Sequence, residues 1–187
     1  MSKISFKPGN MLYPLPAVMV SSMRRGEKPN IITLAWAGTI CSDPAMVSIS
    51  IRPSRYSYDI IKETGEFAIN LVTEDLTYAC DYAGVKSGRD IDKFKELKLT
   101  PYVSGYMDTP AIAESPVNIY CKVDEIRALG SHDMFIATVK GVTVDDRYMD
   151  DKNVFRLDEA HLMTYSHGEY FALGDKLGSF GYSVRKK

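Results

Sequence analysis

Residues 46–72 read MVSISIRPSRYSYDIIKETGEFAINLV, and this stretch decides the fold because it joins two strands through one short helix. In MVSISI (46–51), valine and isoleucine alternate with serine, and this period of two predicts a half-buried strand. YSYDIIKET (56–64) predicts a helix that Gly65 ends, and GEFAINLV (65–72) returns as a strand. A strand, a short helix and a second strand therefore predict a fold in which β-structure dominates.

Two arginines, Arg52 and Arg55, lie at the start of this helix, which Ser54 or Ser57 could cap. A helix N-terminus already carries partial positive charge, so cations there are locally unfavourable. A bound phosphate would offset this effect, because free backbone N–H groups, serine hydroxyls and planar arginine donors all suit an anion. The alternative is a surface helix whose arginines pair with its own acidic side chains, and the stretch alone leaves both interpretations open.

Strands also dominate the rest of the chain. The further predicted strands are PAVMVSSM (16–23), NIITLAWAG (30–38), PVNIYCKVDEIRAL (116–129), DMFIATVKGVTVDD (133–146) and a short one near 160–165. One more short helix is expected over 75–83. Strands joined by hairpins, with few helices, predict an antiparallel barrel with one or two helices packed outside. We expect a single domain over 1–187, with a core over about 12–165 and a C-terminal extension over 166–187.

The composition is that of an ordinary soluble globular protein, with 45% hydrophobic residues, 25% charged residues and a formal net charge of −1. A nearly neutral chain has no overall field that attracts nucleic acid or a membrane, so any anion site must be local. No apolar run approaches the roughly 20 residues that cross a bilayer, and the N-terminus lacks the apolar core of a signal peptide. A cytoplasmic location is therefore expected, with no nucleic-acid or membrane partner.

The metal-ligating residue types are scattered. Three cysteines, far apart, fit neither a disulfide framework nor a zinc site. His161 and His167 are separated by a spacing that suits neither a helix face nor a strand face for a metal pair. We therefore assign no metal, and we interpret Cys41, Cys80 and Cys121 as buried free thiols.

The segment NIITLAWAGTICSDP (30–44) is a second candidate for ligand binding. Ala35, Ala37 and Gly38 would let a flat ligand approach the backbone, and Trp36 is the only tryptophan of the chain. Hydroxyl groups come from Thr33, Thr39 and Ser42. The alternative is a barrel strand with small residues at a crowded corner.

Two loops add further candidates. The loop SGRDIDKF (87–94) could close over an anionic ligand with its basic residues Arg89 and Lys93, or be an ordinary solvated loop. His132, in the turn GSHDMF (130–135), could titrate near neutrality, donate to a ligand or be merely solvated. The chain has neither a G-x-G-x-x-G nor a P-loop motif, which favours a phosphate-bearing cofactor that does not need those loops.

The order of these pieces resembles the flavin reductase-like family of FMN-binding split barrels. The matching pieces, over about 12–145, are PLPAVMVSS, NIITLAWAGTICSDP, MVSISIRPSRYSYDIIKETGEFAINLV, SGRDIDKF, and PVNIYC followed by GSHDMF. The resemblance implies a mainly β fold, a six-stranded antiparallel Greek-key split barrel, that forms a homodimer and binds FMN near the subunit interface.

The resemblance also implies site residues. The flavin ring and ribityl chain are assigned to Thr33, Ala35, Trp36, Ala37, Gly38, Thr39, Cys41 and Ser42. The phosphate is assigned to Arg52, Ser54, Arg55 and Ser57, and the closing loop contributes Ser87 and Lys93. His132 falls at the family's G-D-H turn on the nicotinamide side and is the catalytic candidate, although the turn reads G-S-H-D here.

The implied function is an NAD(P)H-dependent flavin reductase that passes a hydride from NADH or NADPH to FMN and electrons to an acceptor. The tail EYFALGDKLGSFGYSVRKK (169–187) resembles the extended end of the flavoredoxin branch. A flavoredoxin-like electron-transfer carrier, reduced by a redox partner protein and without its own nicotinamide reaction, is therefore the alternative. A flavin-free ligand-binding barrel is the third possibility.

Overall fold

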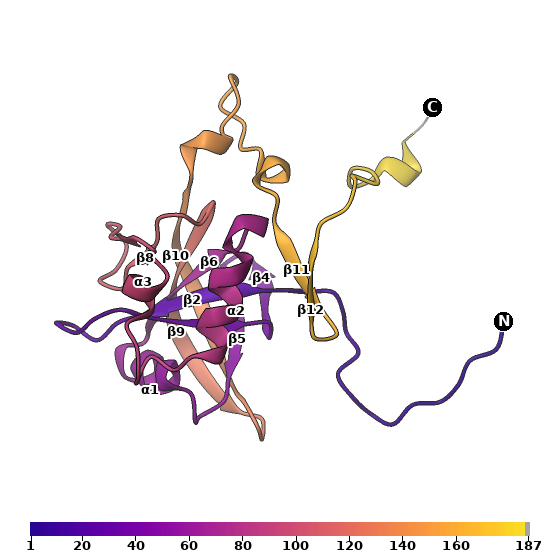
Figure 1. The fold of residues 1–187 in the computed structure, drawn as a ribbon. Helices are drawn as coiled ribbons and strands as arrows, with labels where there is room; N and C mark the ends of the chain where they lie inside the picture. Colours follow the sequence, from indigo (N-terminus) through magenta and orange to yellow (C-terminus); the bar gives the residue numbers. More distant parts are fainter. Residues whose placement is uncertain (186–187) are drawn as a thin grey trace.

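The computed structural model describes residues 1–185. Its centre is a curled antiparallel sheet of seven strands in the order β3-β2-β6-β9-β10-β5-β4 (Figure 1). These strands are β2 (Val18–Ser22), β3 (Asn30–Leu34), β4 (Ala37–Ser42), β5 (Ala45–Ile51), β6 (Glu66–Leu71), β9 (Val117–Ala128) and β10 (Asp133–Val144). The predicted mainly β split-barrel class is confirmed.

The sheet curls because its two edge strands are neighbours in the sequence. β3 and β4 lie at opposite ends of the strand order, yet only Ala35 and Trp36 separate them. An extended residue spans at most about 3.6 Å, so the two edges must come close together. The Ser50 N–H donates to the Trp36 carbonyl over 2.8 Å at this corner. The expected strand over 30–38 is therefore two strands, which is why the sheet has one strand more than the six expected.

Helix α1 (Tyr56–Thr64) connects β5 to β6 and packs Tyr58, Ile60 and Ile61 against the sheet. Gly65 ends it as predicted, with a left-handed φ of 69° and its N–H bonded to the Ile61 carbonyl over 2.9 Å. The predicted serine cap is wrong, because the N-cap residue is Arg55 and no side chain caps the helix. The first N–H groups of α1 are thus left without a side-chain partner.

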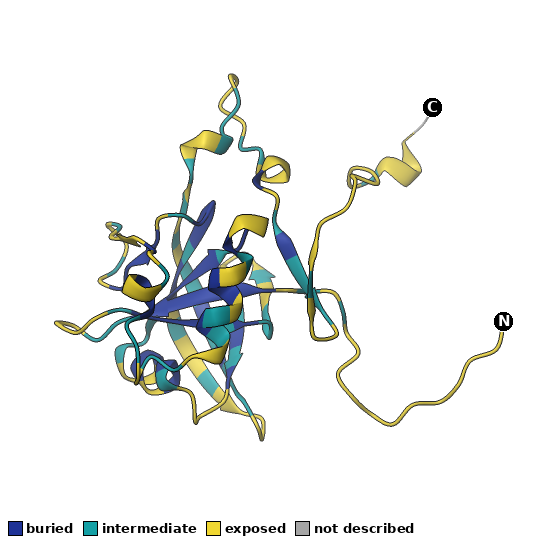
Figure 2. Ribbon diagram, viewed as in Figure 1, coloured by how far each residue is buried: buried dark blue, intermediate teal, exposed yellow. Residues whose placement is uncertain are grey.

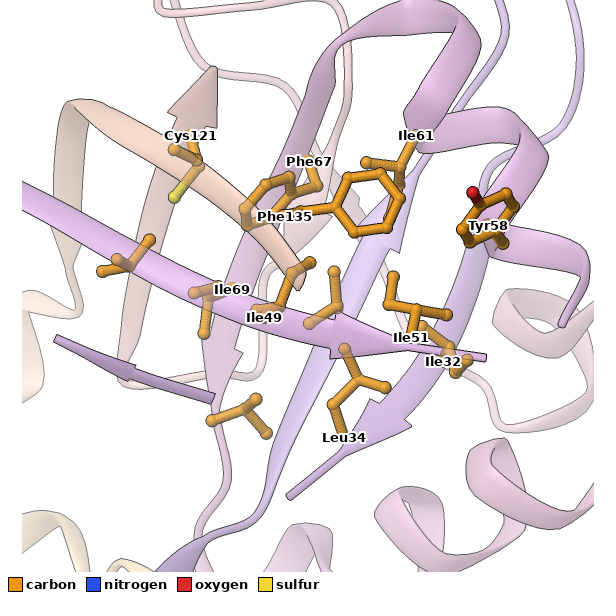
Figure 3. Close-up of a cluster of buried hydrophobic side chains, with 14 residues drawn as sticks. Ile32, Leu34, Ile49, Ile51, Tyr58, Ile61, Phe67, Ile69, Cys121 and Phe135 are labelled. Carbon is orange, nitrogen blue, oxygen red and sulfur yellow. The ribbon is translucent and has the colours of Figure 1, made fainter. Parts of the chain in front are cut away.

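Two hydrophobic clusters lie on opposite faces of β2 and β3, as the alternation of side chains along a strand requires. Inside the curl, Ile32 packs in the cluster of Figure 3 with Phe67 and Phe135. On the outer face, Ile31 packs against Cys80 of helix α2 (Thr77–Val85), which follows the 3₁₀ turn η1 (Glu74–Leu76). Both faces of β2 and most of β3 are therefore buried (Figure 2).

Helix α3 (Lys93–Glu96) follows α2 through the loop 86–92, and its Phe94 joins the outer cluster. The small sheets consist of β1 (Leu15–Pro16), β11 (Met163–Ser166) and β12 (Glu169–Ala172), and of β7 (Pro101–Tyr102) and β8 (Ala111–Ile112). The remaining 3₁₀ turns are η2 (Asp146–Tyr148), η3 (Leu157–Ala160) and η4 (Tyr182–Val184). β11 overlaps the short strand that the sequence predicts near 160–165.

The two ends of the chain extend away from the body as exposed segments (Figure 1). The N-terminal segment exposes Phe6 and Leu12, and the C-terminal tail exposes Leu177 and Phe180. Cys80 and Cys121 are buried as predicted, whereas Cys41 is only partly buried, because it lies on the edge strand β4. Among residues 1–185, no helix is long and apolar enough to cross a membrane.

Candidate functional site: a cationic groove

A groove lies where the start of α1, helix α2 and the corner between β3 and β4 meet. It consists of two adjoining cavities that share Ile32, Arg55 and Gly84. We call the first, of about 180 Å³, the loop cavity, because the loop 86–92 forms one wall. We call the second, of about 190 Å³, the corner cavity, because Ala35 and the neighbouring tryptophan form one wall.

The groove gathers positive charge. The loop cavity is lined by four cationic side chains, Arg55, Lys86, Arg89 and Lys93. The corner cavity adds Arg52 and His132 to the shared arginine. None of the described residues that line either cavity is an aspartate or a glutamate. In a chain of net charge −1, this is a local concentration of cations, and it suits an anion.

The two arginines before α1 do not pair with its acidic side chains. Glu63 instead accepts a hydrogen bond from Arg24 over 2.6 Å. Within residues 1–185, neither Arg52 nor Arg55 forms an ion pair. The alternative in which these arginines serve as partners on a surface helix therefore does not describe the structure.

Lys93 supplies a buried cation to the loop cavity. Lys93 is only 3% exposed. Its Nζ donates to the carbonyls of Ile31 and Ala83, each over 2.6 Å. Burial, and secondarily the charge of Arg55, lower its pKa to about 8. An ammonium group has three donors, and the described residues accept from two of them. A buried cation without a carboxylate partner is costly, and an anion in the loop cavity would relieve that cost.

Ser57 offers a second directed donor. Asn30 donates from Nδ2 to the Ser57 hydroxyl oxygen over 2.7 Å, and both residues are buried. Because this oxygen accepts from Asn30, its own proton remains available to a ligand. Gly88 fixes the loop beside this pair, since a Cβ there would lie 2.0 Å from Asn30 Oδ1. Tyr56 also packs here, with the Arg89 guanidinium 5.3 Å from its ring centre.

The corner cavity has aromatic walls. The rings of Trp36 and His132 lie 6.4 Å apart and are tilted by 31°. Tyr165, from β11, lines the same cavity. His132 Nδ1 lies 2.9 Å from the Ser131 hydroxyl. Burial, followed by the charges of two arginines, lowers the pKa of His132, so its imidazole is neutral at neutral pH.

Thr33 joins one wall of the corner cavity to α2, because its hydroxyl donates to the Cys80 carbonyl. A Cβ at Gly84 would lie 3.1 Å from the Thr33 Cβ, a tight contact that glycine avoids. Thr33 therefore positions the wall through this bond, and its hydroxyl proton is already used.

The groove brings together most of the predicted site residues. These are Thr33, Ala35, Trp36, Arg52, Ser54, Arg55, Ser57, Ser87, Lys93 and His132. Ala37 and Gly38 line a third cavity, of about 560 Å³, beside the N-terminal segment, and this cavity shares Ala35, Trp36 and Ser50 with the corner cavity. Thr39, Cys41 and Ser42 lie farther along β4, outside the groove lining, and their assigned roles stay predictions.

Sequence reasoning missed several lining residues, among them Asn30, Gly84, Gly88 and Tyr165. The signal for Asn30 was a polar residue at the start of the apolar strand NIITL. Tyr165 gave no signal, because it lies far from the other site residues in the sequence. The described residues contain no cluster of three or more His, Cys, Asp or Glu side chains that could hold a metal ion.

Residues 10–174 match the family described as flavin reductase like domain. The chain therefore belongs to the flavin reductase-like family. An uncharacterized protein of Archaeoglobus fulgidus is 33% identical over 141 residues, which cover 75% of this chain and 78% of the relative. Family membership supports assignment to the flavin-linked oxidoreductases.

Solved structures agree with this family and with the fold. Flavoredoxin of Desulfovibrio vulgaris (Miyazaki F) superposes with a TM-score of 0.89 at 30% identity, covering 98% of this chain and 100% of that chain. Flavoredoxin from Methanosarcina acetivorans gives 0.87 at 22% identity, covering 99% and 100% of the two chains. An FMN-binding protein from Thermus thermophilus gives 0.78 at 21% identity, covering 96% and 99%. The latter two likenesses concern the fold alone.

Proposed function

We propose that the protein is an FMN-binding oxidoreductase and that the groove holds FMN, with NADH or NADPH as the electron donor. One observation carries this proposal: a buried ammonium, a directed serine hydroxyl and an uncapped helix N-terminus meet in a cavity that no aspartate or glutamate of residues 1–185 lines. The similarity to flavoredoxins and to an FMN-binding protein supports the choice of FMN among phosphate-bearing ligands.

The donor set of the loop cavity fits the phosphate of FMN. We assign the phosphate to Ser54, Arg55, Ser57 and Lys93. Two separate donors support this assignment. Among residues 1–185, Lys93 has no carboxylate partner, and the Ser57 hydroxyl proton has no acceptor. Arginine supplies planar paired donors that match phosphate oxygens. A flat ring fits the corner cavity, because Ala35 and Gly84 in its lining have a small side chain or none.

When bound, FMN supplies the hydride and electron chemistry, and the protein supplies position and electrostatics. Backbone N–H groups at the corner of β3 and β4 would stabilise negative charge on a ligand there. Trp36 and Tyr165 give the corner cavity aromatic walls, on which a flat ring can pack. His132 is neutral, so it can donate or accept one hydrogen bond toward a second substrate.

The experiment begins with the absorbance spectrum of the purified protein and the binding of added FMN. FMN-loaded protein is then mixed anaerobically with NADH or NADPH while the visible flavin absorbance is followed. Rapid bleaching with either donor is expected. Colourless protein with no thermal shift on adding FMN would overturn the proposal.

A flavoredoxin-like electron carrier is the second candidate. It is favoured by the likeness to a flavoredoxin over almost all of both chains. In this case FMN binds tightly, the nicotinamides react slowly, and a redox partner protein reduces the flavin fast. The same anaerobic experiment with a reduced ferredoxin-type donor separates the two candidates.

We also propose a homodimer in the cytoplasm. The exposed apolar side chains of the N-terminal segment and the C-terminal tail support a second copy as a partner, because extended segments of this kind bury little surface within one chain. Sedimentation analysis measures the mass, and a monomer at micromolar concentration would contradict the dimer.

A further inference from the structure

We propose that Arg89 and Tyr56 close the groove beyond the phosphate, with a carboxylate-lined cavity behind them, so that the protein selects FMN against the dinucleotide FAD. This inference rests on the proposed function, because it concerns how the same groove distinguishes two flavins. FMN and FAD share the ring and the ribityl chain, and they differ only beyond the first phosphate. The discrimination must therefore occur at the far end of the loop cavity.

A further cavity, of about 260 Å³, adjoins the loop cavity, and we call it the end cavity. Four residues line both the loop cavity and the end cavity: Asn30, Tyr56, Gly88 and Arg89. Within residues 1–185, none of the residues that line the end cavity also lines the corner cavity. The loop cavity therefore lies between the other two, and the adenosine half of FAD would extend from it toward the end cavity.

The boundary between the loop cavity and the end cavity is packed. The Arg89 guanidinium lies 5.3 Å from the centre of the Tyr56 ring, and its Nη1 donates to the Ser54 carbonyl over 3.3 Å. A Cβ at Gly88 would lie 2.0 Å from Asn30 Oδ1 and 2.9 Å from the Tyr56 ring. The residues that the two cavities share therefore contact one another, and a second phosphate passes between them only if Arg89 moves.

The charge of the lining reverses across this boundary. The loop cavity is lined by four cationic side chains and by no aspartate or glutamate of residues 1–185. Beyond the shared residues, the end cavity is lined by three carboxylates and one lysine, which are Glu27, Asp90, Asp92 and Lys28. Lys28 Nζ already pairs with Asp92 over 3.4 Å. A second phosphate would therefore leave a cationic lining and meet mainly negative charge.

The donors of the loop cavity also suit a terminal phosphate better than an internal one. A phosphate monoester carries a charge of about −1.5 to −2 at neutral pH and offers three acceptor oxygens. The corresponding phosphate of FAD uses one of these oxygens to bond the second phosphate, and its charge is lower. Lys93, Ser57 and Arg55 together offer donors for all three oxygens of the monoester.

The test compares FMN with FAD by calorimetric titration of the flavin-free protein. FMN is expected to bind about a hundredfold more tightly than FAD, because FAD loses charge-assisted contacts and must displace Arg89. Equal affinities would show that the adenosine half leaves the groove into solvent without cost, and this result would overturn the proposal. Tighter binding of FAD would overturn it as well.

The variant Arg89→Ala assigns the boundary. FAD should bind this variant at least about fivefold more tightly than it binds the original protein, because the passage into the end cavity is opened. The absolute affinity for FAD is the readout, since Arg89 also lines the loop cavity and its loss can weaken FMN. The matched control is Lys86→Ala, which removes a cation that lines the loop cavity but not the end cavity. Arg89→Ala without a gain in FAD affinity, or an equal gain in Lys86→Ala, would overturn the assignment.

The variant Asp90→Asn tests the charge behind the boundary. FAD affinity should rise by about threefold, whereas FMN affinity should stay within about twofold of the original. The matched control is Asp75→Asn, the same change at an exposed aspartate outside all three cavities, which should alter neither affinity. An unchanged FAD affinity in Asp90→Asn would contradict the part of the proposal that concerns the carboxylates.

The inference and the proposed function fail separately. If FMN and FAD bind equally well, the proposed function stands and only the selection between them is overturned. If neither flavin binds, the proposed function is contradicted, and the comparison is made with ribose 5-phosphate and ADP-ribose. These two ligands differ in the same way but lack the flavin ring. Equal binding of the two, or no binding of ribose 5-phosphate, would then overturn the closed boundary.

Discussion

Both cavities of the groove are lined by cationic side chains, but the two cavities differ in how firmly these side chains are fixed. In the loop cavity, Lys93 is buried and fixed by two carbonyls, and Ser57 is oriented by Asn30. In the corner cavity, Arg52 is exposed and has no ion-pair partner among residues 1–185. Fixed donors favour a ligand that stays, because little side-chain entropy is lost on binding. An exposed arginine retains its rotamer freedom and suits a ligand that exchanges.

The largest expected effect is the loss of FMN affinity when phosphate contacts in the loop cavity are removed. Replacing both Arg55 and Ser57 by alanine should weaken FMN binding by about 2–4 kcal/mol, because two charge-assisted contacts to the phosphate are lost. Riboflavin, which lacks the phosphate, should lose much less. Calorimetric titration of both ligands measures the difference, and equal weakening would place the phosphate elsewhere.

The next effect tests how tightly the loop is packed. Gly88→Ala should reduce the free energy of unfolding by about 1–3 kcal/mol, the usual range for overpacking. The added Cβ would meet Asn30 at 2.0 Å and Tyr56 at 2.9 Å. Gly105→Ala is the matched control, because a Cβ there meets nothing within 4 Å. Urea denaturation measures both variants, and similar stabilities would show that the loop does not pack as described.

A third prediction concerns pH. The pKa of Lys93 is lowered to about 8, so the free protein loses this cation as the pH rises through that value. FMN affinity should therefore fall by about tenfold, or about 1.4 kcal/mol, between one pH unit below and one above the pKa. Riboflavin affinity should stay constant. In Lys93→Met the pH dependence of FMN binding should vanish, and its persistence would assign it to another group.

The smallest expected effect is a change in the pKa of His132 in the corner cavity. Arg52→Gln should raise the pKa of His132 toward its ordinary value, because one of the two charges that lower this pKa is removed. Arg25→Gln, the same change at an exposed arginine outside both cavities, should leave the pKa of His132 unchanged. Titration of the imidazole by NMR measures the shift. An unaltered pKa of His132 in Arg52→Gln would show that the charge of Arg52 does not act on His132.

The sequence predicted what local patterns determine. The alternation in 46–51 and the Gly65 stop depend on neighbouring residues, and both are confirmed. The predicted serine cap is wrong, because Arg55, and neither of the two serines, is the N-cap residue. The Ser57 hydroxyl oxygen instead accepts from Asn30, which comes from a distant strand. A contact over so many residues leaves no trace in the local pattern.

The site was predicted by residue type but not by arrangement. Charges at Arg55 and Lys93 were visible, whereas the burial of Lys93 between β3 and α2 was not, because tertiary packing creates it. The corner at Ala35 was expected as part of one strand, and the closing of the sheet split it. Tyr165 lines the groove from β11, which pairs with β1 from the other end of the chain.

A crystal structure of the protein with FMN would show at once whether the loop cavity holds the phosphate. We expect the phosphate to lie within hydrogen-bond distance of Ser57 Oγ and Lys93 Nζ. An FMN phosphate bound on another wall, with these two groups left without an anion, would contradict it.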